Sequence, residues 1–221
     1  MRKEALSNGE TYHIFTRSIA DYKVFNNDAD FDRMKQLVKY YQIENDAKFS
    51  DFIGFQSVKK EGFNNFFEII SQDKEFLVQI IAYCFMPTHI HLVLRQLHER
   101  GIIDYMRRVL NGYSSYFNRQ HRRKGPLWES RFKNVLVNNN EQLLHLTRYI
   151  HLNPVTARLV DNPEEWHFSS YGEYLAEIDD NSAVCQFGNL LEIKPKTYQK
   201  FVNAQKSYQR ELAKIKNLLI E

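Results

Sequence analysis

The chain has 221 residues, 43% of them hydrophobic and 14% aromatic, which is enough to bury a substantial core. Two cysteines alone exclude a disulfide framework or a cysteine-rich zinc site, and no apolar run reaches the roughly 20 residues of a membrane span. The net charge is only +3, yet residues 95–133 hold ten lysines and arginines against three acids. A basic block in a near-neutral chain favours a surface that binds a polyanion.

The first quarter of the chain predicts one strand and one helix. Alternation predicts a strand over residues 11–17, and apolar residues at helical spacing predict a helix over residues 28–46, with Asp28 or Asp30 as its cap. Residues 47–73 are rich in phenylalanine but show no sustained period. We expect a helical or mixed insertion there.

The middle of the chain predicts a hairpin followed by a helix. Strands are expected over residues 76–85 and 89–96, and the turn Met86-Pro87-Thr88 between them favours an antiparallel pair. Apolar residues then form one helical stripe over residues 102–120, with most of the basic residues facing away from it.

A short strand over residues 132–137 precedes a helix over residues 141–153, which Pro154 is expected to end. In the C-terminal tail, residues 178–189 resemble a loop and residues 195–220 a polar helix. The order of elements predicts an α+β fold, a ferredoxin-like antiparallel sheet with helices packed on one face, plus a helical C-terminal tail. The N-terminus has no hydrophobic signal core, so we expect a cytoplasmic protein with no membrane partner.

The sequence His89-Ile90-His91 is the most specific motif of the chain. On a strand the two histidines point to the same face, with α-carbons about 6–7 Å apart, close enough to share one metal ion. The alternative is a pair of solvated histidines on an open sheet face. The motif alone leaves both interpretations open.

Tyr149 and Asn153 are four residues apart on the helix predicted over residues 141–153, and therefore share a face. A tyrosine hydroxyl becomes a nucleophile when its target phosphate is polarised and its proton can leave, and a nearby metal supplies the polarisation. Asn153 offers a neutral oxygen as a third ligand beside two imidazoles. The alternative is that Tyr149 packs on the core and Asn153 ends the helix, and among 13 tyrosines this position alone does not decide.

Three stretches of the chain carry a resemblance: AYCFMPTHIHLVL, then SSYFNRQHRRKGPLWESRFKNVLV, then LTRYIHLNPVTARLV followed by WHFSSYGEYL. In this order they resemble blocks of the REP-associated tyrosine transposases, part of the insertion-sequence-200-like group of single-tyrosine, His-hydrophobic-His enzymes. The resemblance covers roughly residues 8–175, which we expect to form the catalytic domain with an insertion near residues 47–73. Residues 176–221 form a tail without a counterpart.

The resemblance implies a chemistry for four residues. His89 and His91 match the metal-binding histidines, Tyr149 matches the nucleophile, and Asn153 matches the polar residue that completes the metal site. The implied metal is Mg²⁺ or Mn²⁺. The implied activity is cleavage and rejoining of single-stranded DNA through a 5′-phosphotyrosine intermediate.

The basic block supplies the predicted DNA contacts. Its cations can neutralise phosphates, and a tryptophan can stack on unpaired bases. The residues are Arg107, Arg108, Arg119, Arg122, Arg123, Lys124, Trp128, Arg131 and Lys133. The alternative is that Trp128 is core and the arginines form a solvated face. We expect single-stranded or hairpin DNA as the partner, bound by a monomer or a homodimer.

Three other functions are compatible with the same residues. The chain could be a nucleic-acid-binding regulator that keeps the transposase fold without activity. It could be a metallohydrolase that activates water instead of Tyr149. A replication initiator or relaxase of the same superfamily is the third, although these usually place the histidine strand differently relative to the tyrosine.

Overall fold

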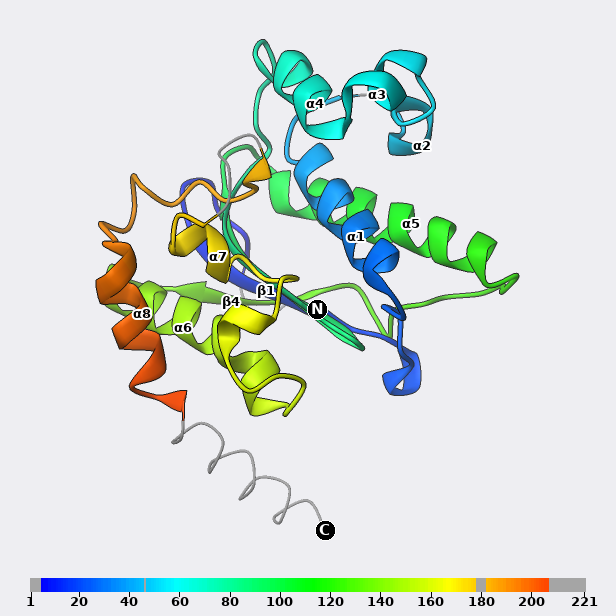
Figure 1. Ribbon diagram of the computed structural model, residues 1–221. Helices are drawn as coiled ribbons and strands as arrows, with labels where there is room; N and C mark the ends of the chain where they lie inside the picture. The colour runs from blue at the N-terminus through cyan, green and yellow to red at the C-terminus, as the bar shows by residue number, and fades with distance from the viewer. Residues whose placement is uncertain (1–4, 46, 178–181, 207–221) are drawn as a thin grey trace.

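A four-stranded antiparallel sheet forms the centre of the protein in the computed structural model, which describes residues 5–45, 47–177 and 182–206 (Figure 1). The strands are β1 Thr11–Arg17, β2 Val78–Met86, β3 His89–Gln96 and β4 Lys133–Val137. Their order in the sheet is β2-β3-β1-β4, and every neighbouring pair is antiparallel. The predicted α+β class and the antiparallel, ferredoxin-like sheet are confirmed.

Eight α-helices and two short 3₁₀ helices are present in the described residues. They are α1 Asp28–Tyr40, α2 Phe49–Phe52, α3 Gln56–Glu61, α4 Phe63–Ser71, α5 Gly101–Gln120, α6 Asn140–Thr156, α7 Tyr171–Tyr174, α8 Pro195–Asn203, η1 Ile19–Asp21 and η2 Pro163–Glu165. The predicted helical insertion is thus three short helices, α2 to α4. The helix predicted over residues 195–220 is observed as α8, and residues 207–220 lie outside the described part.

Helices cover both faces of the sheet, not one as the sequence predicted. α1 and α5 pack on the face formed by residues such as Ile14 and Leu92. α6, α7 and α8 pack on the opposite face, against Val93 and its neighbours. The physical reason lies in β2, where every residue is buried: a strand that is apolar on both sides needs a cover on both sides.

The ends of two helices also differ from the predictions. The cap of α1 is Asn27, whose side chain accepts a hydrogen bond from the backbone N–H of Asp30. α6 runs through Pro154 to Thr156, so the prediction that it ends before the proline is wrong. Pro154 lies in the last turn, where it removes a single N–H donor, and the Ala157 N–H still bonds the carbonyl of Asn153 at 2.9 Å.

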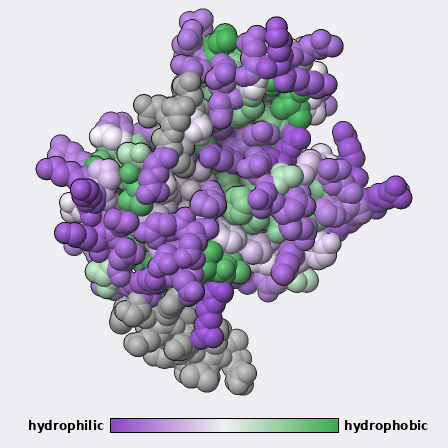
Figure 2. Space-filling view, viewed as in Figure 1, coloured by the Kyte–Doolittle hydropathy of each residue, from purple (hydrophilic) through white to green (hydrophobic). Residues whose placement is uncertain are grey.

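The C-terminal segment is joined to the core. Tyr198 and Val202 of α8 are buried against α6. The predicted division of the chain at residues 175 and 176 stays a prediction. In the described ranges, no helix combines the length and apolar composition of a membrane span. The surface in Figure 2 is largely hydrophilic with separate apolar patches, one over α2 to α4, where Phe55 is 55% exposed and Ile69 is 56% exposed.

Candidate active site

Three histidines meet on the sheet face that α6 covers in part. In the pairing of β1 with β3, His91 lies opposite Phe15 and His13 lies opposite Val93. Directly paired residues share a face, so His13, His89 and His91 all point to the same side. The ring centroid of His91 is 5.0 Å from that of His89 and 5.2 Å from that of His13.

Each histidine of β3 uses its Nδ1 atom in a hydrogen bond. His89 Nδ1 is 3.0 Å from Thr88 Oγ1, and His91 Nδ1 is 2.9 Å from His13 Nε2. Within the described residues, neither Nε2 atom of the β3 pair has a hydrogen-bond partner. The two Nε2 atoms are therefore available to a ligand.

Burial keeps these histidines neutral. It lowers the pKa of His13 and of His89 to about 4, and lowers the pKa of His91 well below its ordinary value. Desolvation is the largest cause in each case, because a buried cation loses its hydration. A neutral imidazole is the form that binds a metal ion.

Tyr149 of α6 lies beside this cluster. Its ring is edge-on to His91, with centroids 6.2 Å apart, and edge-on to His13 at 6.4 Å. The side chain is 43% exposed. The rest of the side chain is buried, and this burial is the main reason that the pKa of the Tyr149 hydroxyl is raised. Tyr149 is therefore protonated at neutral pH. The helix thus places the predicted nucleophile next to the predicted ligands and in contact with solvent.

Asn153, one helical turn after Tyr149, is 8% exposed, and its buried Nδ2 atom has no hydrogen-bond partner in the described structure. A buried polar atom without a partner is uncommon in a folded protein. The described residues contain no group of three or more histidine, cysteine or acidic side chains arranged around a metal. Two neutral imidazoles and the side-chain amide of Asn153 would nevertheless be a donor set compatible with a divalent cation.

The predicted DNA contacts on α5 lie elsewhere. Arg107, Arg108 and Arg119 belong to the helix that packs on the opposite face of the sheet from the histidines. They line a groove of about 530 Å³ between α1, α2 and α5 that has no acidic side chain in its lining. The groove also holds Arg33, whose guanidinium lies 5.1 Å from the ring centroid of Phe49. Sequence reasoning missed Arg33, because it lies outside the basic block.

The remaining predicted DNA contacts are scattered around the end of α5. Arg122 and Lys124 are exposed in the loop, whereas Arg123 donates to the carbonyl of Pro126 at 2.9 Å. Arg131 lines a second groove of about 520 Å³. Lys133 begins β4 opposite Phe15 and is exposed, so this predicted cation lies on the histidine face.

Trp128 is a core residue. It is 8% exposed, its ring centroid is 6.1 Å from that of Tyr113, and its indole N–H donates to the carbonyl of Leu110. This position corrects the expectation that Trp128 stacks on unpaired bases. After α5 the chain folds back against the helix, and the indole ring is more stable packed on Tyr113 and Leu110 than in water.

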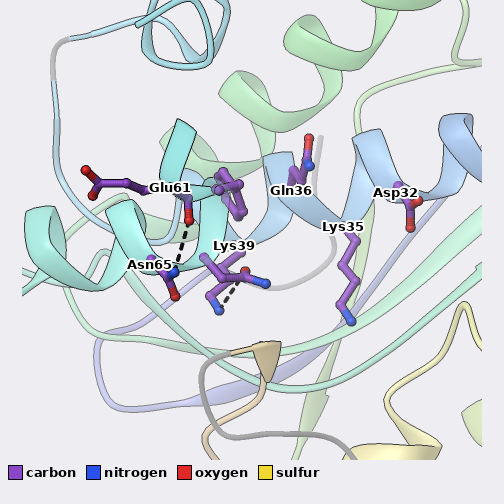
Figure 3. Close-up of a pocket in the computed structure, with 9 residues that line it drawn as sticks. Asp32, Lys35, Gln36, Lys39, Glu61 and Asn65 are labelled. Carbon is purple, nitrogen blue, oxygen red and sulfur yellow. Dashed lines mark hydrogen bonds between the residues drawn. The ribbon is translucent and has the colours of Figure 1, made fainter. Parts of the chain in front are cut away.

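A cavity of about 450 Å³ lies between α1 and the α3–α4 segment (Figure 3). Lys39, at its base, donates to Asn64 Oδ1 at 3.2 Å, and burial is the main cause that lowers its pKa to about 8. None of the residues lining this cavity belongs to the histidine cluster.

Comparisons with known proteins agree with the resemblance seen in the sequence. Residues 55–153 match the family model described as "Transposase IS200 like". A putative REP-associated tyrosine transposase of Haemophilus influenzae is 32% identical over 104 residues, which cover 42% of this chain and 58% of that relative. The chain therefore spans less than two thirds of the relative it matches.

A solved structure of a REP-associated tyrosine transposase bound to a REP hairpin matches with a TM-score of 0.51 and 15% identity. The match covers 88% of this chain and 98% of the other, and at this identity it shows a shared fold. The family model and the curated relative thus agree with the resemblance to IS200-like, REP-associated tyrosine transposases, and the solved structure shows that the fold is shared.

Proposed function

We propose that this protein cleaves and rejoins single-stranded DNA, with Tyr149 as the nucleophile. The observation that supports this most directly is the position of Tyr149, which is 43% exposed and edge-on to His91, a histidine whose Nε2 atom has no hydrogen-bond partner in the described residues. Attack by its hydroxyl oxygen on a phosphate forms a 5′-phosphotyrosine and releases a 3′-hydroxyl. A different 3′-hydroxyl then reverses the step and joins two strands without ATP, since the ester to Tyr149 conserves the bond energy.

In this proposal His89, His91 and Asn153 hold Mg²⁺ or Mn²⁺. The bound cation would polarise the scissile phosphate and balance the negative charge that develops during in-line attack. Because the pKa of the Tyr149 hydroxyl is raised, its proton leaves as the bond to phosphorus forms rather than beforehand. The catalytic domain in this proposal is residues 8–175.

The basic residues of α5 and the following loop bind the DNA backbone in the same proposal. The related structure contains a REP hairpin, which supports hairpin DNA as the partner. Arg107, Arg108 and Arg119 are separated from the histidines by the sheet. They would therefore bind a different segment of the DNA from the one that is cut, such as the stem of a hairpin. Lys133, on the histidine face, would contact the strand near the scissile phosphate.

The test is an adduct assay. The protein is incubated with a labelled single-stranded DNA that carries a hairpin, in the presence of Mn²⁺, and run on a denaturing gel. A covalent adduct is expected for the natural protein and none for Tyr149→Phe, which should still bind the DNA. Tyr22→Phe is the matched control, because Tyr22 is 48% exposed but its ring packs on Phe117 of α5, and it should keep the adduct.

Each other outcome points to a different function. An adduct that persists in Tyr149→Phe shows that another tyrosine is the nucleophile. Metal-dependent cleavage without an adduct indicates a hydrolase that activates water. DNA binding by the natural protein without cleavage indicates a regulator that retains the fold.

A further inference from the structure

His13 has no role in the function proposed above, yet it lies at the centre of the site. It sits in the middle of β1, the strand between β3 and β4. Its ring contacts His91 at 5.2 Å, Phe15 at 4.9 Å and Tyr149 at 6.4 Å between centroids. Its ring therefore lies against a predicted ligand on β3, His91, and against the predicted nucleophile on α6, Tyr149.

The hydrogen bond between His13 Nε2 and His91 Nδ1 is 2.9 Å long, and its direction decides what His91 can do. A neutral imidazole carries one proton, on either Nδ1 or Nε2. If His91 donates from Nδ1 to the Nε2 lone pair of His13, the Nε2 atom of His91 is unprotonated and can bind a cation. If His13 donates instead, the proton of His91 sits on Nε2 and blocks that position.

Thr88 holds His89 in a parallel way. Its hydroxyl oxygen is 3.0 Å from His89 Nδ1 and can accept a proton from it, which leaves His89 Nε2 unprotonated. Both histidines of the motif thus have a partner at Nδ1, the pattern by which outer residues fix the tautomer and ring orientation of metal-ligating histidines. The partner of His89 is the residue just before β3, and the partner of His91 is a residue of β1.

His13 is not itself placed as a ligand. Its Nε2 atom is already within hydrogen-bond distance of His91, and no three histidine, cysteine or acidic residues of the described chain are arranged around a common ion. The hydrogen bond to His91 instead allows His13 to act through that neighbour.

We propose that His13 is a positioning residue: by accepting the Nδ1 proton of His91 it presents the Nε2 atom of His91 to a divalent cation, and its ring holds Tyr149 against the same site. The inference rests on the proposed function, in that it takes His91 to be a metal ligand. It adds His13, a residue of β1 that is not part of the His89-Ile90-His91 motif, to the residues that control metal affinity.

The experiment measures Mn²⁺ affinity without DNA, from the electron paramagnetic resonance signal of free Mn²⁺ in titrations of the full chain. His13→Leu, which removes the acceptor, should weaken Mn²⁺ binding about 10- to 100-fold. His13→Gln should bind within about threefold of the natural protein, since its side-chain oxygen can accept the same proton. His98→Leu is the control, because His98 pairs with Glu75 at 3.2 Å outside the site, and it should leave affinity unchanged.

A second measurement separates positioning from packing. In nitrogen-15 NMR of the metal-free protein, His91 should carry its proton on Nδ1, and His13→Leu should move this proton toward Nε2 while the rest of the spectrum remains folded. Affinity of His13→Leu equal to that of the natural protein would overturn the proposal, as would a His13→Gln variant as weak as His13→Leu. Absence of Mn²⁺ binding in the natural protein would refute the metal site of the proposed function instead. In that case the NMR measurement alone would show whether His13 accepts the Nδ1 proton of His91.

Discussion

Two histidine clusters of this protein lie on the same side of the sheet and differ in how their polar atoms are satisfied. His151 of α6 is fully buried, with Nδ1 2.7 Å from the Tyr198 hydroxyl and Nε2 2.8 Å from Ser170 Oγ. The Tyr198 hydroxyl in turn donates to Thr147 Oγ1 at 2.9 Å. Both ring nitrogens of His151 are used, whereas His89 and His91 each have one nitrogen left over.

The comparison shows that burial and a shifted pKa do not by themselves mark a functional histidine. Burial lowers the pKa of His151 to about 3 and that of His89 to about 4, so both are neutral. What separates them is the unused nitrogen. A satisfied network fixes the fold, because its members have no capacity for another partner. An incomplete network beside a half-exposed tyrosine has capacity for a ligand.

The largest effect should come from removing the incomplete cluster. In a His89→Ala, His91→Ala double variant, Mn²⁺ affinity should fall by more than about 100-fold, as expected when ligands rather than outer residues are lost. The DNA adduct should disappear with it. Titration with Mn²⁺ and the adduct assay measure the two losses. Urea unfolding serves as the control, and a large loss of stability with intact metal affinity would reverse the roles assigned to the two clusters.

Removing the satisfied cluster should have the opposite result. His151→Leu leaves buried partners short of a hydrogen bond and should lower the free energy of unfolding by about 2–4 kcal/mol. Urea denaturation measures this change. The Mn²⁺ affinity of the molecules that remain folded should stay within a few-fold of the natural value. A tenfold weaker affinity in fully folded protein would mean that the two clusters are coupled.

The pH dependence of stability sharpens the same comparison. The folded-state pKa of His151 is about 3, below the 6.5 of an unfolded histidine, so at pH values between them the unfolded chain binds the proton more readily. The free energy of unfolding should therefore fall as the pH drops below 6.5, with a contribution from His151 of about 2 kcal/mol by pH 5. Urea titrations at several pH values should show a shallower decline for His151→Leu than for the natural protein. An unchanged slope would contradict the burial of a neutral His151.

The smallest effect concerns the far face of the sheet. Arg119→Ala should weaken hairpin binding by a few-fold and reduce the slope of log affinity against log salt concentration by about 1. Fluorescence anisotropy at several salt concentrations measures both. Lys196→Ala, an exposed cation of α8, is the matched control and should change neither. Mn²⁺ affinity should be the same in all three proteins, since Arg119 is separated from the histidines by the sheet.

Local pattern predicted the strands that carry the site. The bounds of β1 and β3 agree with the alternation of their side chains, and the histidines of β3 share a face as the spacing requires. The contact between His13 and His91 was not predictable, because it depends on the register of β1 against β3, which a single sequence does not contain. The sequence left open whether Trp128 is buried or binds DNA for a related reason, because a residue in a loop is covered or exposed according to where the chain returns.

The partners of His151 lie 19 and 47 residues after it in the chain, at Ser170 and Tyr198. During synthesis from the N-terminus, the β3 histidines and Tyr149 are therefore made before the contacts that hold α6 are complete. Until Tyr198 has been synthesised, Nδ1 of His151 lacks the tyrosine hydroxyl that is its hydrogen-bond partner. The helix that carries Tyr149 should thus reach its final position only after Tyr198 has been synthesised and has packed against it.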